Sequence, residues 1–573
     1  MSIKSVKNRT ENNIIITSTF KTKTKTKATP APIHPITMAT ATATATATLL
    51  DSNIGEGKYD NKNNVDISID TDGDNGDSSS RCSGSCDWYN GNVDASGFSW
   101  LASGRGMLVM SNIFMSTSLL WLAKNEAGCF EDPTIEGECH KEVHGMKAES
   151  FVTNIATIAA VLSAIFMPIC GAIVDYTPHR KLVGIITAIV LIVIQAVQIG
   201  TTKETWFPMG VLQAIAAFIY QLQVVVVFAY LPDIARDVGE LTMTRFSSRF
   251  SAVQYFSSVI FLVIVTAISI GLRSKSSDVL TGQISQGLNT VTSIILFGIG
   301  WSRLTQRPAV RELPEGHSLL LQGFRQIWNT AKSVQRQYKH GLRWFLLAVV
   351  FAEASATAIT TVSIVYLSSV IHLSGPQIGI FFIITLLATT VGTLWATFVT
   401  NKTNPNTSWK LSMLYLFVVL MAGALALDGI AESLKLLSYI WAVVVGLGLG
   451  WYYPTENLFF ALCLPKGQEA EFAGFWTYCG QILAWFFPLL FSVLIENNIS
   501  QKYGVTLVAS GFLVAIICLM FTCSWEELIE EVNTNTNTIS NTTSTTTKKV
   551  EGERKDDDND CMHDLALDEE YNV

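Results

Sequence analysis

The chain has 573 residues, of which 49% are hydrophobic and only 15% are charged, and its mean hydropathy is +0.34. This composition excludes an ordinary soluble protein and indicates a membrane protein. The net charge of −8 says little about partners, because acidic residues are concentrated at the C-terminus. No cofactor and no nucleic-acid partner is expected.

Both ends of the chain are polar. Residues 1–100 contain KTKTKTK (21–27), alternating Ala and Thr (39–48) and an Asp/Asn/Gly/Ser-rich run (51–80), and we predict a disordered low-complexity tail. The tail has no apolar core of a cleaved signal peptide; an organelle transit peptide and a plain cytosolic arm both fit its composition. Residues 525–573 are predicted to form a disordered acidic tail.

Between the tails lie twelve candidate membrane spans. A helix needs about 20 apolar residues to cross a bilayer. The candidates are 106–123, 151–174, 182–200, 207–230, 250–272, 284–301, 344–368, 376–399, 410–428, 436–463, 474–496 and 503–523. The least apolar are the first and the sixth, and the longest gap, 302–343, separates two halves of six spans, 101–301 and 344–524.

The linker 302–343 is basic, and its apolar and basic residues alternate at helical spacing. It fits an amphipathic helix on an anionic leaflet and, equally, a solvated linker helix. With both termini in the cytosol, the cytosolic loops hold about twice as many Lys and Arg residues as the opposite loops, which favours that orientation.

The first loop on the opposite side contains Cys129 and Cys139, ten residues apart. An oxidising compartment would allow them to form a disulfide. His140 and His144 lie in the same loop, but two histidines with scattered carboxylates do not make a metal site, and none is expected.

The loop after the second span carries a compact charge cluster. Gly171 and Asp175 are followed by Arg180 and Lys181, in the stretch CGAIVDYTPHRKLVG (170–184). The spacing resembles the G-x-x-x-D-R-x-G-R-R loop of the major facilitator superfamily, although Tyr176 and Pro178 replace an arginine and a glycine. The resemblance implies an all-α membrane protein with twelve transmembrane helices in two six-helix halves, and a gating role for the four residues.

Further stretches narrow the resemblance. They are YLPDIA (230–235), GLGLG (446–450) and the run from Pro465 to Phe491, in which Glu469, Glu471, Phe472, Gly474 and Pro488 match. These are similar to the vacuolar effluxer family linked to autophagy, also called the unknown-major-facilitator group. Phe487 departs from the pattern, and Asp87-Trp88-Tyr89-Asn90 only partly matches the signature of the first span. The resemblance implies efflux of amino acids from a vacuole.

Two acids lie inside predicted spans, where an ionisable group usually faces a cavity. Glu353 precedes Thr357, Thr360 and Thr361 at helical spacing, which predicts one polar stripe. Glu456 follows Tyr452 and Tyr453 and lies beside Pro454, so it could receive an ammonium group. For Glu353, proton coupling, substrate contact and a structural bond between helices are all open.

Other polar residues inside spans are weaker candidates for lining a substrate cavity. They are Asn112, Asn154, Gln213, Tyr220 and Gln221. Each alone is more often a bond between helices than a ligand contact. Gly446, Gly448 and Gly450 lack the context of a phosphate loop and predict close helix packing.

We therefore predict a multi-pass secondary transporter that acts as a monomer. The resemblance implies the vacuolar membrane, and the plasma membrane or another organelle membrane are the alternatives. It would move a small polar solute by alternating access, and amino acids are the favoured substrate. A proton is a candidate coupling ion, and membrane lipid surrounds the protein. A sugar–cation symporter and a non-transporting receptor or scaffold are the alternatives. No clustered catalytic constellation occurs, so an enzyme is not expected.

Overall fold

The computed structural model describes residues 92–130, 139, 141–231, 233–234, 240–272, 278–309, 313, 318–339, 341–427, 432–463, 469–531 and 534. Most of the two predicted tails lies outside these ranges. So do His140, Pro465 and the stretch Asp87-Trp88-Tyr89-Asn90.

Within the described ranges, the first half is built from six long helices: α2 (Val93–Glu126), α3 (Phe151–Tyr176), α4 (Arg180–Gln198), α5 (Trp206–Phe228), α7 (Glu240–Gly271) and α8 (Asp278–Arg303). α2 begins well before the predicted residue 106. Its start is fixed by Asn92, whose Oδ1 accepts a hydrogen bond from the N–H of Ala95 at 3.0 Å. The residues from Asp94 to Phe98 are buried, so the folded region begins inside the predicted tail.

The linker contains α9 (Leu319–Gln337), and the second half follows it. Its helices are α10 (Leu342–Ser369), α11 (Gly375–Lys402), α12 (Pro405–Ala426), α13 (Glu432–Leu462), α14 (Glu469–Ile482), α15 (Phe486–Glu496) and α16 (Gln501–Met520). The eleventh predicted span is thus two helices. Pro488 lies in the first turn of α15, where the missing N–H of proline costs no helical hydrogen bond.

A hairpin precedes α3. Strand β1 (Glu142–Val143) pairs antiparallel with β2 (Met146–Lys147), with Glu142 opposite Lys147. The turn residues His144 and Gly145 have φ values of 50° and 78°, as a two-residue hairpin turn requires. The short 3-10 helix η1 (Ala148–Ser150) then leads into α3.

Eleven segments of the described chain are long and apolar enough to cross a membrane, and α8 is the one predicted span not among them. The polar side chains of α8 are buried against α2 instead of facing lipid: Ser285, Gln286 and Asn289 are fully buried, and Asn289 Nδ2 donates to Ser111 Oγ at 2.9 Å. The all-helical membrane fold is confirmed, while the count of twelve spans stays a prediction at α8.

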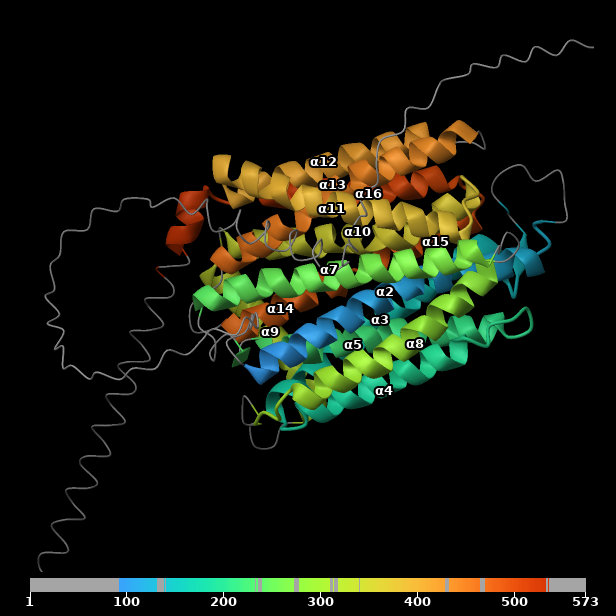
Figure 1. The fold of residues 1–573 in the computed structure, drawn as a ribbon. Coiled ribbons are helices and arrows are strands. Elements are labelled where there is room, and N and C mark those ends of the chain that lie inside the picture. The colour runs from blue at the N-terminus through green and yellow to red at the C-terminus, as the bar shows by residue number, and fades with distance from the viewer. Residues whose placement is uncertain are drawn as a thin grey trace, which may run out of the picture. The chain divides into compact units, whose positions relative to one another are not determined.

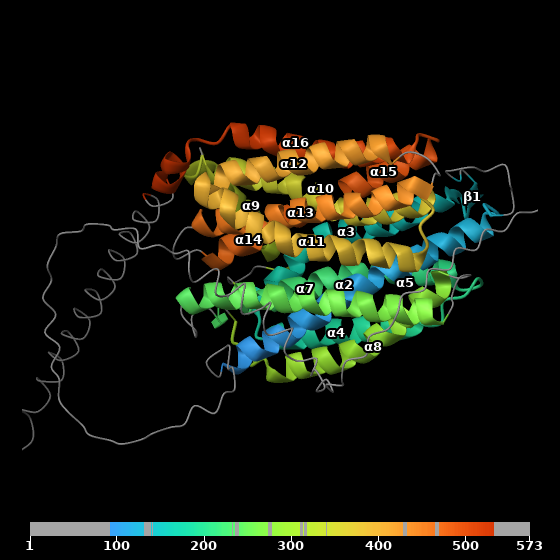
Figure 2. The same cartoon turned by 45° about the horizontal axis from the view of Figure 1, so that its top comes forward.

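The helices pack in the same pattern twice. In the first half, α2 packs against α7 and α8, α3 against α5, and α4 against α5 and α8. In the second half, α10 packs against α14 and α16, α11 against α13, and α12 against α13 and α16. Each pair holds the same place in the helix order of its half. The described part of the chain therefore contains two structural repeats, which lie against each other in Figures 1 and 2.

The halves meet through equivalent helices. The second helix of the first half, α3, packs against α14 and α15, and the fifth helix, α7, packs against α11. These contacts place α3, α7, α11 and the α14–α15 pair at the boundary between the repeats. Polar residues near this boundary are therefore able to contact both halves.

Glycines allow α11 and α13 to approach closely. A Cβ atom at Gly450 would lie 2.0 Å from the carbonyl oxygen of Thr389, and one at Gly446 would lie 2.3 Å from that of Thr385. Only glycine leaves room for this backbone contact. The predicted role of this glycine run in close helix packing is confirmed.

Candidate functional site

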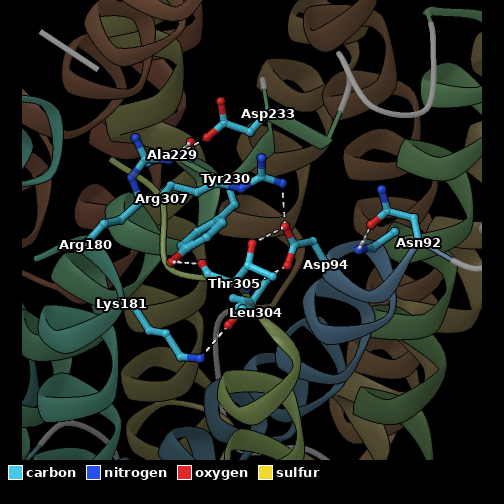
Figure 3. Close-up of polar contacts among 11 residues, drawn as sticks. Asn92, Asp94, Arg180, Lys181, Ala229, Tyr230, Asp233, Leu304, Thr305 and Arg307 are labelled. Atoms are coloured by element: carbon cyan, nitrogen blue, oxygen red, sulfur yellow. Dashed lines mark hydrogen bonds and ion pairs between the residues drawn. The ribbon is translucent and has the colours of Figure 1, made fainter. Parts of the chain in front are cut away.

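The charge cluster of the sequence lies where α3 ends and α4 begins (Figure 3). The Arg180 side chain is only 2% exposed, and its Nη1 donates to Asp233 Oδ2 at 2.8 Å and to the carbonyl oxygen of Ala229 at 2.9 Å. Its guanidinium carbon also lies 5.3 Å from the centre of the Tyr230 ring. Arg180 thereby ties the start of α4 to the segment that follows α5.

The segment after α8 joins the same cluster. Lys181 Nζ donates to the carbonyl oxygen of Leu304 at 2.5 Å. Asp94, near the start of α2, accepts hydrogen bonds from Thr305 N at 2.7 Å and Thr305 Oγ1 at 2.8 Å, and pairs with Arg307 Nη2 at 2.6 Å. Figure 3 shows these side chains converging from α2, α4 and the segments after α5 and α8. We call this end of the bundle, which also carries α9, the linker face.

Gly171 and Asp175 lie in the last two turns of α3, and both are half-buried. A Cβ atom at Gly171 would meet no atom within 4 Å, so this glycine is not required by close packing. The bonds that Arg180 makes to Asp233 and Lys181 makes to Leu304 do not reach the second half. The role of these four residues in a gate between the halves stays a prediction.

Sequence reasoning did not assign Asp233, Asp94 or Arg307 to this cluster. Asp233 lies in YLPDIA, which the sequence marks only as a family feature. An acid directly after an apolar span was a usable signal, because such a carboxylate needs a cation nearby. Asp94 carried no such signal, since it lies in the polar region before the first predicted span.

The two predicted acids come together in the second half. Tyr452 Oη on α13 donates to Glu353 Oε1 on α10 at 3.1 Å. Glu456, one turn after Tyr452, is 1% exposed and lies within electrostatic range of both Glu353 and Tyr452. The side chain of Trp476 also lies within range of its carboxylate. A buried carboxylate is costly when alone, so this acid pair has the charge to hold a cation or a proton.

The accessible side of α10 carries the predicted polar stripe. Thr357 is exposed, and Glu353, Thr360 and Thr361 are half-buried, whereas most residues of this helix are buried. The spacing of four and seven residues places Glu353, Thr357 and Thr360 on one face. The stripe extends the polar surface one and two turns beyond the acid pair.

The first half contributes Tyr255 of α7 to the surroundings of the acid pair. Tyr255 is within electrostatic range of Glu353 and of Tyr453, and its side chain is 39% exposed. Tyr255 was not predicted, because only the fold brings α7 towards α10 and α13. Its position connects the acids of the second half to the first half.

The remaining cavity candidates make other contacts. Gln213 is buried and accepts a hydrogen bond from Gln198 Nε2 at 2.8 Å, which joins α5 to α4. Asn154 Oδ1 accepts from Ser492 Oγ at 2.6 Å, which joins α3 to α15 across the two halves. Three further candidates are half-buried: Asn112, Tyr220 and Gln221.

At the other end of the bundle, Cys129 and Cys139 form a disulfide. We call this end the disulfide face. Here Lys124 Nζ pairs with Glu149 Oε1 at 3.0 Å and donates to Ser369 Oγ of α10 at 2.8 Å. Cys139 N also donates to Glu149 Oε1 at 3.0 Å. The buried lysine therefore joins the first half to the second.

Two further contacts close the disulfide face. Lys147 donates from its backbone N to Glu496 Oε1 and from Nζ to the carbonyl oxygen of Ile495, both at 3.0 Å. Asp278, the first residue of α8, accepts from the N–H of Gly375, the first residue of α11, at 2.8 Å. Polar bonds therefore hold the two halves together at this face.

Solved structures share this arrangement of helices. The xylose transporter XylE from E. coli, in an inward-open conformation, covers 76% of this chain and 98% of its own, with a TM-score of 0.51 and 13% identity. A D-xylose–proton symporter covers 74% and 97%, with a TM-score of 0.51 and 12% identity. Identities this low show the fold alone. With its two helix repeats, the described part of the chain has the major facilitator fold.

The sequence places the chain within that class. The family described as vacuole effluxer Atg22-like matches residues 96–527, and the chain belongs to this family. Autophagy-related protein 22 of Cryptococcus neoformans var. neoformans serotype D, from strains JEC21 / ATCC MYA-565 and B-3501A, is 24% identical over 285 residues. The aligned part is 46% of this chain and 48% and 50% of the two relatives. The chain thus matches about half the length of these relatives.

Proposed function

We propose that the chain moves amino acids out of a vacuole by alternating access. The observation that carries the proposal is the acid pair, Glu353 and Glu456, beside Tyr452 and Tyr453. The carboxylates would attract the ammonium group of an amino acid, and the aromatic rings would add cation–π attraction. The family description, vacuole effluxer, supports the direction of transport.

We assign a coupling proton to the same acids. Two carboxyl groups close together inside a protein repel each other when both are ionised, so a proton held between them relieves the repulsion. The ammonium group of an arriving substrate would supply a positive charge in place of the proton. Exchange of proton for substrate at one acid pair would then couple their movements.

The gate would operate by rocking of the two halves. Opening the disulfide face has to break the bonds of Lys124 with Ser369, of Lys147 with Glu496, and of Asp278 with Gly375. The cluster around Arg180 would keep the linker face of the first half rigid during this motion. Asp175, at the end of α3, would carry the predicted gating contact.

The orientation follows from the positive-inside rule. The linker face holds the basic linker together with Arg180 and Lys181, so we place it in the cytosol. The disulfide face would then face the vacuolar lumen, where a disulfide is stable.

Transport from proteoliposomes tests the proposal. Vesicles loaded with labelled amino acids, and separate vesicles loaded with labelled sugars, are assayed for efflux with and without a pH gradient. We expect amino acids to leave the vesicles, and we expect the pH gradient to change the rate of this efflux. Movement of sugars alone would point to a sugar–cation symporter. No movement of any solute, with partner proteins still bound by the tails, would point to a receptor or scaffold.

A further inference from the structure

Helix α9 of the linker has three different faces. Gly323, Thr330 and Val334 are buried against the bundle. A second side exposes four large apolar residues: Leu320 (57%), Leu321 (69%), Phe324 (40%) and Trp328 (63%). Next to it runs a third, basic side of three exposed residues: Arg325, Lys332 and Arg336. At 3.6 residues per turn, the spacings of four and seven residues keep each set on its own stripe.

The buried face attaches α9 to the first half through the end of α3. Gln322 Nε2 donates to the Tyr176 hydroxyl at 3.1 Å. Gly323 lies so close to α3 that a Cβ atom there would come within 2.0 Å of the carbonyl oxygen of Pro168. Tyr176 is the residue that replaces an arginine in the signature loop.

The later turns of α9 attach to the second half. Thr330 Oγ1 donates to Glu471 Oε1 of α14 at 2.5 Å. Just after the helix, the buried Tyr338 packs its ring against Phe472 at 5.8 Å between centroids. In Figures 1 and 2, α9 lies beside α14 at the linker face. The helix therefore crosses the boundary between the halves at the ends of membrane spans.

The exposed apolar stripe indicates what covers α9. Four large apolar side chains pointing into water would be unfavourable, and a solvated linker has no need of them. Their helix is held at the ends of α3 and α14, where the hydrocarbon of a bilayer gives way to headgroups. Tryptophan and the basic residues beside it are typical of that interface.

The basic side is arranged for a phosphate group. Lys332 and Arg336 line a shallow hollow together with the polar side chains of Asn329, Ser333 and Gln337. Lys332 Nζ lies 5.4 Å from the centre of the Trp328 ring, so the cation is held at the edge of the apolar stripe. Cations and hydrogen-bond donors around one hollow suit an anionic headgroup.

We propose that α9 lies in the surface of an anionic leaflet, with Leu320, Leu321, Phe324 and Trp328 inserted among the lipids, and that Lys332 and Arg336 bind the phosphate of an anionic phospholipid. Because its two ends contact opposite halves, bound lipid steadies one relative position of the halves. This last consequence rests on the proposed function, whereas the lipid site does not.

Lipid retention tests the headgroup site. The full chain is placed in nanodiscs of phosphatidylcholine and phosphatidylserine, released, and analysed by native mass spectrometry for bound phosphatidylserine. Each basic residue near an anionic surface changes binding by about fivefold, so the double variant Lys332→Gln/Arg336→Gln should lose about tenfold or more of the retained phosphatidylserine. The charge-conserving pair Lys332→Arg/Arg336→Lys should retain it. Lys203→Gln/Lys502→Gln, with two charges removed at the disulfide face, should also leave retention unchanged.

Equal retention by the Gln variant and the charge-conserving variant would overturn the headgroup site. The acidic segment 535–573 is the other occupant that charge would allow. If truncation after residue 534 raises phosphatidylserine retention while the Gln variant has no effect on the full chain, the tail covers the basic side and the proposal is wrong.

Membrane depth tests the apolar stripe. Nitroxide labels are placed at Leu321→Cys and at Asn329→Cys, each with Cys82, Cys86, Cys523 and Cys561 replaced by Ser. Their accessibility to oxygen and to a water-soluble nickel complex is measured in nanodiscs. The label at residue 321 should be more accessible to oxygen, and the label at residue 329 should be more accessible to the nickel complex. Equal access of nickel to both would show a solvated helix and overturn the insertion. Both measurements are independent of transport, so inactivity in transport would contradict the proposed function alone.

Discussion

Tyr452 of α13 donates a hydrogen bond to Glu353 of α10 at 3.1 Å, with Glu456 buried beside them. This bond links two residues that are 99 positions apart in the sequence. It orients the Glu353 carboxylate next to the polar stripe of Thr357 and Thr360. Under the proposed function, this position makes Glu353 the first candidate for exchanging a proton or contacting cargo.

Replacement of Glu353 by Gln tests that role. The amide keeps the size of the side chain but cannot carry a proton, so accumulation driven by a pH gradient should stop while exchange of labelled for unlabelled amino acid continues. Tyr452→Phe removes one hydrogen bond, worth about 1 kcal/mol, and should weaken accumulation only several-fold. Both are measured by uptake into proteoliposomes. Undiminished accumulation by Glu353→Gln would dismiss Glu353 as the coupling acid.

Arg180 and Asp233 should contribute measurably to stability. Removing one partner of a buried ion pair typically costs about 3 kcal/mol or more, because the other charge loses its compensation. We expect Arg180→Ala to lower the free energy of unfolding by about that amount, and Lys181→Ala, which loses one bond to a carbonyl oxygen, by about 1 kcal/mol. Chemical unfolding in detergent, followed by near-UV circular dichroism, measures both.

A double-mutant cycle with Asp233→Ala isolates the pair. The combined variant should lose less stability than the two single losses added together. Strict additivity would mean that the 2.8 Å contact between Arg180 and Asp233 contributes no energy.

Local periodicity predicted the membrane helices and the stripe of Glu353 and Thr357, because both depend on spacing within one helix. It failed at the start of α2, where the polar residues around Asn92 and Asp94 lowered hydropathy although the helix is capped and buried there. It also left α8 as one of the two weakest spans, because buried polar residues such as Asn289 bond to α2 instead of facing lipid.

Contacts between distant segments could not be predicted in the same way. Arg180 and Asp233 lie 53 positions apart, and Lys147 and Glu496 lie 349 apart. Nothing in the local pattern selects these partners, since a charged residue at a helix end or in a loop is expected even without a distant partner. The polar contacts that close the disulfide face could therefore be found only from the fold.

The approach of α11 and α13 predicts a strong effect of glycine replacement. A Cβ atom at Gly450 would overlap the backbone of α11, so Gly450→Ala should destabilise the second half by about 1–3 kcal/mol. Gly298 of α8 is the matched control, because a Cβ atom there would meet nothing within 4 Å. Thermal unfolding in detergent compares the two. Equal stability of Gly450→Ala and Gly298→Ala would contradict the close approach of the helices.

Asp278 predicts a pH dependence at the disulfide face. Burial raises the pKa of Asp278, and the hydrogen bond from Gly375 N opposes this only in part. The folded protein therefore binds a proton at Asp278 more tightly than the unfolded chain does. Its contribution to stability is full below the unfolded value of about 3.9 and is lost as pH rises through the raised folded value.

Asp278→Asn should remove this contribution to the pH dependence. The amide cannot ionise and still offers an oxygen to Gly375 N. The difference in unfolding temperature between the variant and the unmodified chain should therefore change over the mildly acidic pH range. It should be constant at pH values below and above that range. A constant difference over the whole range would mean that Asp278 does not titrate in this window.

Asn154 and Ser492 provide a test of the rocking motion itself. Their side chains bond at 2.6 Å across the two halves, so cysteines at both positions can be joined by a short bifunctional thiol reagent. Joining them should arrest transport, because the disulfide face can no longer open, and cleaving the cross-link should restore it. Ser111 and Asn289, which bond at 2.9 Å within the first half, are the matched control. Cross-linking that pair should leave transport unchanged, because the first half moves as one body. Continued transport with the Asn154 and Ser492 positions joined would exclude alternating access by separation of α3 from α15.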